Sequence, residues 1–354
     1  MAIPTEPIGS IPRPAQLIQA GHDLAAGRIT AADYARLADA AVRETIEQLE
    51  ATGSPVITDG EQTKPSFATY PLVGLENLAP DGAVIPFEDG HTRQLPRLTA
   101  GPFRYATHAD TYLARALQIA HVPVKQAVIA PSALSLTYPQ AGIEDYPREQ
   151  FIEDLVNEAE ADVRGSLAGG AYKVQLDFTE GRLSVKLDPS KQLLGEFIEL
   201  NNRVLERFSD AELERIGVHT CPGSDQDAAH SLDVPYHELL PSLLQLKAGN
   251  FYIQLASEKD PRSVLEVIRD HAQPNQRIFI GVIDPIDPRI ETADEVRDRV
   301  LQAAEYIPVE QLGSTDDCGF SPFGDDTSTP RETAFAKIRA RVEGTRMASE
   351  ELGV

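Results

Sequence analysis

The sequence predicts a single (β/α)8 barrel, and three observations support this fold class. Short apolar runs alternate with segments of helical period in strand–helix units of roughly 30–40 residues, as in such barrels. The runs lack strict apolar–polar alternation, which is typical of a parallel sheet buried on both faces. No glycine-rich phosphate-binding turn follows the first run, where "PIGSIPRP" stands at 7–14, and this disfavours an open doubly wound sheet.

Eight apolar, β-branched runs are predicted to form the strands of the barrel. They are bounded by turn residues and are spaced along the whole chain. The predicted strands are 6–10, 55–60, 124–131, 172–178, 215–221, 250–256, 277–284 and 311–318.

Helices are predicted between most of these strands. The clearest signal covers residues 148–168, where Phe151, Leu155 and Ala159 lie on one apolar stripe. Capping residues mark other helix starts. These starts are Ser190 before an apolar helix, Thr292 with Glu295, and Thr329-Pro330 with Glu332, with Pro330 at the first helical position. Further helices are expected over 31–51, 236–247 and 261–271.

The segment 61–122 is too long for a simple connection between two strands. It contains a stretch rich in proline and glycine and a predicted helix at 109–120. We therefore expect one domain over 1–354, with this segment as an elaboration after the second strand that covers the barrel mouth.

Composition excludes several classes of protein. The net charge is −23, from 55 acidic and 32 basic residues, and this charge repels the phosphates of nucleic acids. No apolar run approaches the roughly 20 residues that span a bilayer, and the N-terminus lacks a secretion signal. The chain has only 2 cysteines, too few for a disulfide framework. We expect a cytoplasmic protein with small-molecule partners.

Polar side chains stand at the ends of the predicted strands. In a (β/α)8 barrel these ends meet at one face, where active sites are built. The candidates are Ser10, Asp59, Glu61, Asp177, Glu180, His219, Cys221, Gln254, Asp284, Asp287, Asp316, Asp317 and Cys318. Both cysteines are among them.

His219 and Cys221 form a candidate metal site with Cys318. Side chains two residues apart on a strand point the same way, and Cys318 lies three predicted strands further round the barrel. Imidazole and thiolate groups are common zinc ligands, and three protein ligands leave a position open for a substrate. Two alternatives stay open from the spacing: small buried thiols beside a core histidine, or a redox pair.

Five motifs resemble the catalytic barrel of the cobalamin-independent methionine synthase family. They occur in family order over nearly the whole chain. The motifs are "IGSIPRP" (8–14), "TDGEQTK" (58–64), "VQLDFTEG" (174–181), "VHTC" (218–221) and "DDCGF" (316–320).

The resemblance implies one catalytic zinc ion held by His219, Cys221 and Cys318. The family also uses a glutamate ligand, and Gln254 stands at the matching position in "FYIQLASE" (251–258). A neutral amide in place of a carboxylate would raise the Lewis acidity of the bound zinc and lower the affinity of the site for the metal. We expect Gln254 near the metal, with Glu258 as an alternative ligand.

The resemblance also implies a substrate site for homocysteine. Glu61 and Asp177 match residues that contact the substrate amine, and the backbone near Gly9 and Ser10 matches the carboxylate contact. Each acid could instead cap a helix. The family chemistry is transfer of a methyl group to a zinc-activated thiol, as in methionine synthesis.

Two further readings remain open. The chain lacks room for the second, N-terminal barrel of full-length members and resembles the short relatives, so a thiol alkyltransferase or lyase of the epoxyalkane:coenzyme M type is one alternative. A non-catalytic zinc-binding barrel is the other. Asp284, Asp316 and Asp317 are expected to cap loops or orient His219, and His230 to lie at the surface or serve a proton relay.

Overall fold

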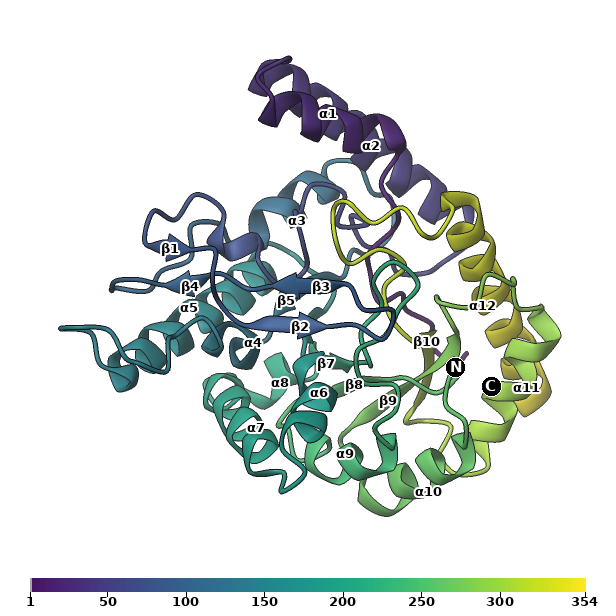
Figure 1. Cartoon of the computed structure of the whole chain (residues 1–354). Coiled ribbons are helices and arrows are strands. Elements are labelled where there is room, and N and C mark those ends of the chain that lie inside the picture. Colours follow the sequence, from purple (N-terminus) through teal and green to yellow (C-terminus); the bar gives the residue numbers. More distant parts are fainter. Residues whose placement is uncertain (1) are drawn as a thin grey trace.

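A six-stranded parallel sheet forms the centre of the computed structural model, which describes residues 2–354. The strand order is β10-β9-β8-β7-β6-β5, so successive strands are neighbours in the sheet (Figure 1). The bounds are β5 Gln126–Ile129, β6 Val174–Asp177, β7 Ile216–Thr220, β8 Asn250–Ile253, β9 Arg277–Ile283 and β10 Leu312–Asp316. These six strands lie within six of the predicted ones.

Isolated parallel bridges extend the sheet at both edges. Thr5 pairs with Ser314 of β10, and Ile57 pairs with Val124 just before β5. The two added segments meet each other, since the Ile11 amide donates to the Gly60 carbonyl at 3.0 Å. This arrangement of an α/β fold is consistent with a TIM-type barrel.

The prediction of regular strands at 6–10 and 55–60 is wrong, because the first bridge lies at Thr5, just before 6–10, and the second region contributes only the bridge at Ile57. Pro7 lacks the amide hydrogen that a ladder requires. Gly60 has a φ of +67°, which turns the second segment out of the extended conformation soon after its bridge.

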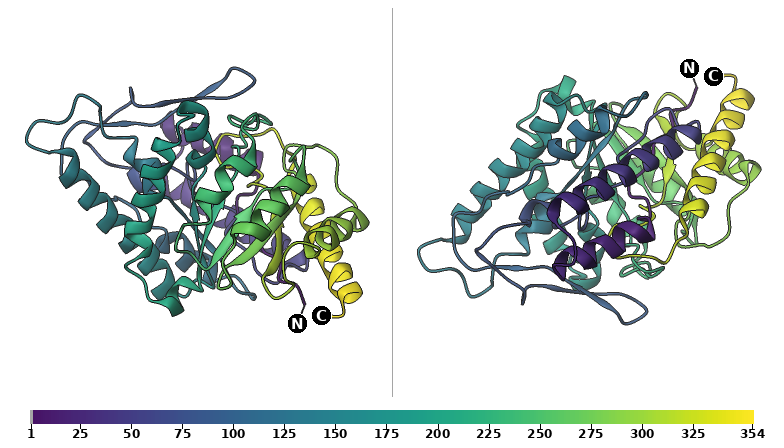
Figure 2. Two further views of the ribbon diagram at one scale, coloured as in Figure 1. Left: turned by 90° about the horizontal axis from the view of Figure 1, so that it is seen from below. Right: turned by 90° about the horizontal axis from the view of Figure 1, so that it is seen from above.

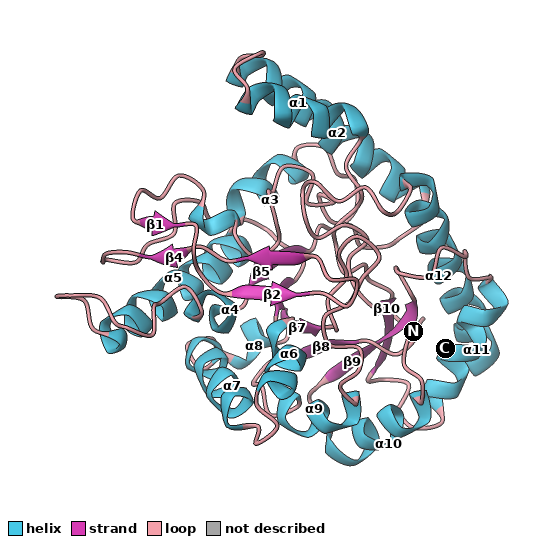
Figure 3. Ribbon diagram, viewed as in Figure 1, coloured by secondary structure: helices cyan, strands magenta, loops and turns pink. Residues whose placement is uncertain are grey.

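Helices surround the sheet on its outer side (Figure 3). Their bounds are α1 Ala15–Ala25, α2 Ala31–Ala51, α3 Asp110–Leu117, α4 Pro131–Ser135, α5 Arg148–Ala168, α6 Glu180–Leu187, α7 Gln192–Leu205, α8 Asp210–Leu213, α9 Tyr236–Leu243, α10 Pro261–His271, α11 Ala293–Ala304 and α12 Arg331–Leu352. The predicted helices 31–51 and 148–168 match α2 and α5. The chain ends lie close together (Figure 2), and the Ile3 amide donates to Ser349 Oγ of α12 at 3.0 Å.

One of the three predicted helix starts is confirmed. Thr292 and Glu295 form the expected capping box before α11. Ser190 does not cap α7, because its hydroxyl donates to Asp188 at 2.6 Å and the helix begins at Gln192. The prediction at Thr329-Pro330 is also wrong: Pro330 is itself the N-cap of α12 and has extended backbone angles, so no side chain caps this helix.

Residues 61–122 contain small elements outside the central sheet. Two antiparallel pairs lie here, β1 (Leu78–Ala79) with β4 (Arg97–Leu98) and β2 (Val84–Pro86) with β3 (Thr92–Gln94). A 3-10 turn at Tyr70–Leu72 and helix α3 complete the segment. The β2–β3 hairpin passes across the sheet in Figure 1.

Apolar side chains between the sheet and the helices form one continuous core cluster. All positions of β5, β6, β7, β8 and β10 are buried, as expected for a parallel sheet covered on both faces. Within residues 2–354, no helix has the length and hydropathy required to cross a membrane. The core therefore fixes the strand ends, and these ends carry the polar residues described next.

Candidate metal centre

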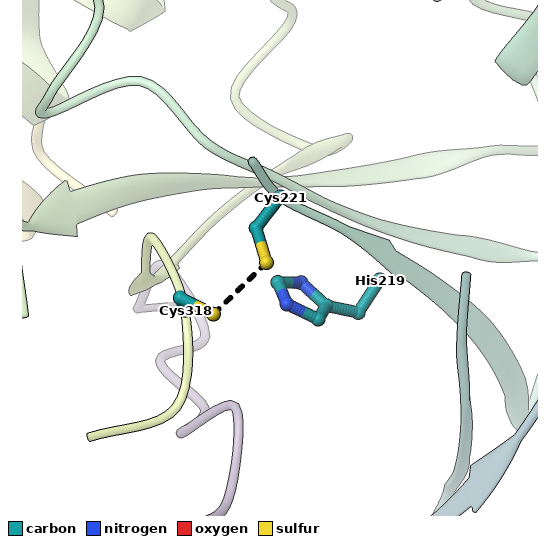
Figure 4. A group of neighbouring side chains, drawn as sticks. All are labelled: His219, Cys221 and Cys318. Carbon is teal, nitrogen blue, oxygen red and sulfur yellow. Dashed lines mark hydrogen bonds between the residues drawn. The ribbon is translucent and has the colours of Figure 1, made fainter. Parts of the chain in front are cut away.

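His219, Cys221 and Cys318 converge at the carboxyl ends of β7 and β10 (Figure 4). One ligand atom from each residue lies within 4.8 Å of the other two. The two Sγ atoms are 2.9 Å apart and belong to free cysteines. All three side chains are buried. The structure therefore brings together the three residues that the sequence analysis selected as ligands.

Local geometry explains how β7 presents two of them. His219 and Cys221 are two residues apart, so their side chains leave the strand on one side. Pro222 and Gly223 then turn the chain. Gly223 has a φ of +83°, and a Cβ atom at this position would lie 2.3 Å from the His230 ring. Glycine thus allows the loop after Cys221 to pack closely against His230.

Cys318 is placed by an irregularity at the end of β10. The register with β9 shifts between Thr315 and Asp316. Asp317 then accepts hydrogen bonds from the backbone amides of residues 255–257 at 2.7–2.9 Å, and from the Ser257 hydroxyl at 2.8 Å. This buried carboxylate anchors the loop after β8 beside Cys318.

The three side chains fit a metal ion. Both ring nitrogens of His219 are buried and lack a hydrogen-bond partner among the described residues. Leaving a buried polar atom unsatisfied costs about 1–3 kcal/mol, so an unpaired imidazole beside two thiols favours a cation. Two sulfurs and one imidazole nitrogen are typical ligands of zinc. The cluster could hold such an ion.

Negative charge at the cluster concentrates on one sulfur. Burial opposes ionisation of Cys221, but the hydrogen bond with Cys318 and the nearby His219 hold the pKa of Cys221 well below its ordinary value. The same hydrogen bond, together with burial, raises the pKa of Cys318 well above its ordinary value. Burial lowers the pKa of His219, yet the charge on Cys221 raises it overall.

Gln254 and Glu258 both bind the guanidinium of Arg182. Arg182 Nη1 donates to Gln254 Oε1 at 3.1 Å and to Glu258 Oε1 at 2.6 Å. Gln254 Nε2 donates to Ser257 Oγ at 2.6 Å. Both candidate ligand oxygens therefore accept hydrogen bonds from a buried cation, and ligation by either residue stays a prediction.

Three of the four predicted substrate residues line a cavity together with the cluster: Ser10, Glu61 and Asp177. Gly9 is not among the lining residues, and its carbonyl accepts a hydrogen bond from the Thr58 hydroxyl at 2.7 Å. Burial raises the pKa of Asp177 to about 6.

Lys64 engages the other predicted acid. Its Nζ donates to Glu61 Oε1 at 2.9 Å and to the Ala127 carbonyl at 2.9 Å. Burial opposes the charge on Lys64, but Glu61 raises its pKa overall. Glu61 thus already has an ammonium partner within the protein, which the sequence analysis did not foresee.

Aromatic and aliphatic side chains form a partial roof over the cavity, which has a volume of about 60 Å³. Ile85 and Phe87 come from the β2–β3 hairpin, and Phe67 and Phe323 from loops. Arg93 of β3 fixes the hairpin through Asp225 and Asp325, with four bonds of 2.6–3.0 Å. Sequence reasoning missed this roof, since no motif in the segment indicates it.

His230 departs from expectation, whereas Asp317 and Asp284 accept hydrogen bonds from loop amides, which is one of the two roles expected for them. His230 is buried and lines the cavity, so its placement at the surface is wrong; burial lowers its pKa to about 4. Asp316 pairs with Arg341, and Asp284 accepts from the Ile286 amide at 3.0 Å. Since both ring nitrogens of His219 lack partners among residues 2–354, none of the predicted acids orients this histidine.

Comparison with known proteins identifies the family. A model described as "Cobalamin-independent synthase, Catalytic domain" matches residues 3–345. The chain is 24% identical over 323 residues to a 5-methyltetrahydropteroyltriglutamate–homocysteine methyltransferase of Nitratidesulfovibrio vulgaris, covering 90% of this chain and 38% of that relative. It is 23% identical to the methionine synthase of Sulfurisphaera tokodaii, covering 99% of this chain and 94% of the relative.

A solved structure shares the fold. It is a B12-independent methionine synthase from Shewanella sp. W3-18-1 in complex with selenomethionine, with a TM-score of 0.78, 19% identity and 99% coverage of both chains. The chain thus spans about two fifths of the Nitratidesulfovibrio relative and nearly all of the Sulfurisphaera one. The match over residues 3–345 shows that the chain belongs to the family of cobalamin-independent synthase catalytic domains.

Proposed function

We propose that the protein is a zinc-dependent thiol S-methyltransferase that converts a thiol, with homocysteine preferred, into a thioether. One observation carries the proposal: two thiols and an imidazole that has no other hydrogen-bond partner among residues 2–354 meet in the wall of a largely apolar cavity. The names of the relatives support it, since they are methionine synthases or homocysteine methyltransferases.

His219, Cys221 and Cys318 would hold the zinc ion. Bound zinc supplies positive charge that deprotonates a coordinated thiol at neutral pH. We propose three protein ligands, because the oxygens of Gln254 and Glu258 are bonded to Arg182. A three-ligand site keeps a position for the substrate thiol.

The other residues of the cavity bind and enclose the substrate. We propose that Asp177 accepts the substrate ammonium, and that Ser10 and the nearby Gly9 backbone contact the carboxylate. We propose that Glu61 contributes less to binding of the substrate ammonium than Asp177 does, because Lys64 Nζ already donates to Glu61 at 2.9 Å. The roof of Phe67, Phe87 and Phe323 excludes water, which strengthens electrostatic interactions inside the cavity.

We also propose that residues 1–354 form one closed (β/α)8 barrel with an insertion at 61–122. The segments around Thr5 and Ile57 would supply the two remaining strand positions. Their bridges to Ser314 and Val124, and their contact through Ile11 and Gly60, support a ring of eight.

A second candidate is a thiol alkyltransferase that acts on a different thiol. The Lys64–Glu61 ion pair favours it, because one of the two acids expected to bind an amine is already neutralised. A thiol without an ammonium group would leave that ion pair undisturbed.

The test combines metal analysis with a thiol panel. The purified protein should hold about one zinc per chain. The zinc-loaded protein, supplied with methyl-folate, methylcobalamin or an epoxide, should form a thioether from homocysteine. Exclusive use of a thiol without an amine would favour the second candidate. A protein that binds no zinc, or that alkylates no thiol, would contradict both.

A further inference from the structure

A second and larger chamber lies beside the cavity over the metal centre. It has a volume of about 630 Å³ and is lined by α1, the loop 62–69, β3 and residues 323–325. We call it the side chamber. It shares four wall residues with the metal cavity: Phe67, Ile85, Arg93 and Phe323. Side chains therefore form a common wall between the two spaces.

Two aromatic rings dominate this wall. The Phe67 and Phe323 centroids are 5.7 Å apart, with the rings nearly perpendicular at 78°. The Arg93 guanidinium lies 4.3 Å from the Phe323 centroid. Both phenylalanines are half-buried. Passage between the two spaces would require these wall side chains to move.

Size separates the roles of the two spaces. The metal cavity of about 60 Å³ has room for a few water molecules or one end of a small thiol. A thioether-forming enzyme needs a second reactant, which carries the carbon to the sulfur. The side chamber, with about 630 Å³, is within the range of about 300–1,000 Å³ that is typical of ligand pockets.

The chemistry of the side chamber favours an uncharged ligand. Its walls include Leu17, Ile18 and Leu24 of α1, Tyr34 of α2 and Leu95. These apolar and aromatic side chains suit a ring-bearing or aliphatic body, and uncharged polar residues such as Gln62 and Thr63 stand beside them in the wall.

Arg13, Lys64 and Arg93 of the chamber are already bonded within the protein, and the fourth basic residue, His22, lies at an exposed position of α1. Arg13 donates to the carbonyls of Glu61 and Lys64 at 2.6 and 3.1 Å. Lys64 pairs with Glu61, and Arg93 pairs with Asp225 and Asp325. A polyanionic tail would have to displace these pairs against a net charge of −23.

We propose that the side chamber binds the carbon donor, and that this donor is an uncharged electrophile with an apolar or aromatic body. The assignment as donor site rests on the proposed function. The thiol sulfur forms a bond to the donor carbon, and the bond from that carbon to its leaving group breaks. The leaving group takes the electron pair and the proton that the thiol gave up, so the exchange balances.

Binding of a neutral probe tests the site without catalysis. Prodan, an uncharged naphthalene dye, should bind the full-length protein saturably, with blue-shifted emission. Ile18→Glu places a carboxylate in the chamber wall and should weaken binding by at least about tenfold, because an ion is costly to desolvate against an apolar ligand. Gln16→Glu is the matched control: it adds the same charge at an exposed position of α1 outside the chamber wall.

The outcomes of the binding experiment are distinct. Non-saturable binding to the wild type, or equal affinities of the two variants, would overturn the proposal. Sedimentation of the wild type and both variants gives a second readout. If the wild type self-associates and Ile18→Glu dissociates it, a second copy of the chain covers the chamber. This result would also overturn the proposal.

Kinetics test the donor role. Prodan should compete with the methyl donor and not with the thiol. In addition, kcat/KM for a methyl-folate with a triglutamate tail should not exceed kcat/KM for the monoglutamate form. Competition with the thiol, or a large advantage of the triglutamate, would refute the assignment. A protein that methylates no thiol would refute the proposed function alone, because prodan binding and its loss in Ile18→Glu remain measurable.

Discussion

Breaking the buried Lys64–Glu61 pair should destabilise the protein strongly. Both side chains are almost completely buried, with 1% and 5% exposure. At the observed 2.9 Å, an effective dielectric constant of about 20 gives roughly 6 kcal/mol of gross attraction. Lys64→Met removes the ammonium and leaves the carboxylate of Glu61 buried without its charged partner. Removing one partner of such a pair costs about 3–5 kcal/mol, and we expect that loss here.

Urea denaturation at pH 7 measures the loss, with two further variants as controls. The double variant Lys64→Met/Glu61→Gln should recover much of the stability, because no uncompensated charge remains. Lys247→Met removes a lysine from an exposed pair with Glu206 and should change stability by less than about 1 kcal/mol. A loss below about 1 kcal/mol in Lys64→Met, or no recovery in the double variant, would refute the reasoning.

Three further predictions concern the metal centre and a buried acid. Cys221→Ser should lose zinc and thiol alkylation but keep its circular dichroism spectrum; full activity would remove Cys221 from the mechanism. Gln254→Glu should leave zinc retention against a chelator unchanged, because the new carboxylate meets Arg182; tighter retention would make residue 254 a ligand. Burial raises the pKa of Glu180 to about 8, so the folded state holds a proton that the unfolded state releases. Its contribution to stability, full below about pH 4.5, should fall by about 1.4 kcal/mol per pH unit up to pH 8. Glu180→Gln should flatten this dependence, and an unchanged urea midpoint profile would contradict it.

The proximity of His219, Cys221 and Cys318 could be predicted from the sequence because it follows from local rules. Two-residue periodicity places His219 and Cys221 on the same side of a strand. The convergence of strand ends adds Cys318. Six strands were predictable for a related reason: runs such as 278–283 are continuously apolar, as is typical of buried parallel strands.

Other features depend on contacts that no local pattern encodes. Arg182 reaches Gln254 across 72 residues of sequence, and Arg93 reaches Asp225 across 132. The roof residues Ile85 and Phe87 belong to a short hairpin that the ion pairs of Arg93 with Asp225 and Asp325 hold in place. Such polar links between distant segments form only in the folded chain, so their partners could not be named from the sequence.

The separation of 97 positions between Cys221 and Cys318 ties the candidate metal centre to the completion of folding. During synthesis, His219 and Cys221 leave the ribosome well before Cys318 is made. A nascent or truncated chain that stops before β10 offers an ion only two of the three side chains. Tight metal capture at this site would therefore report that β10 has joined the sheet.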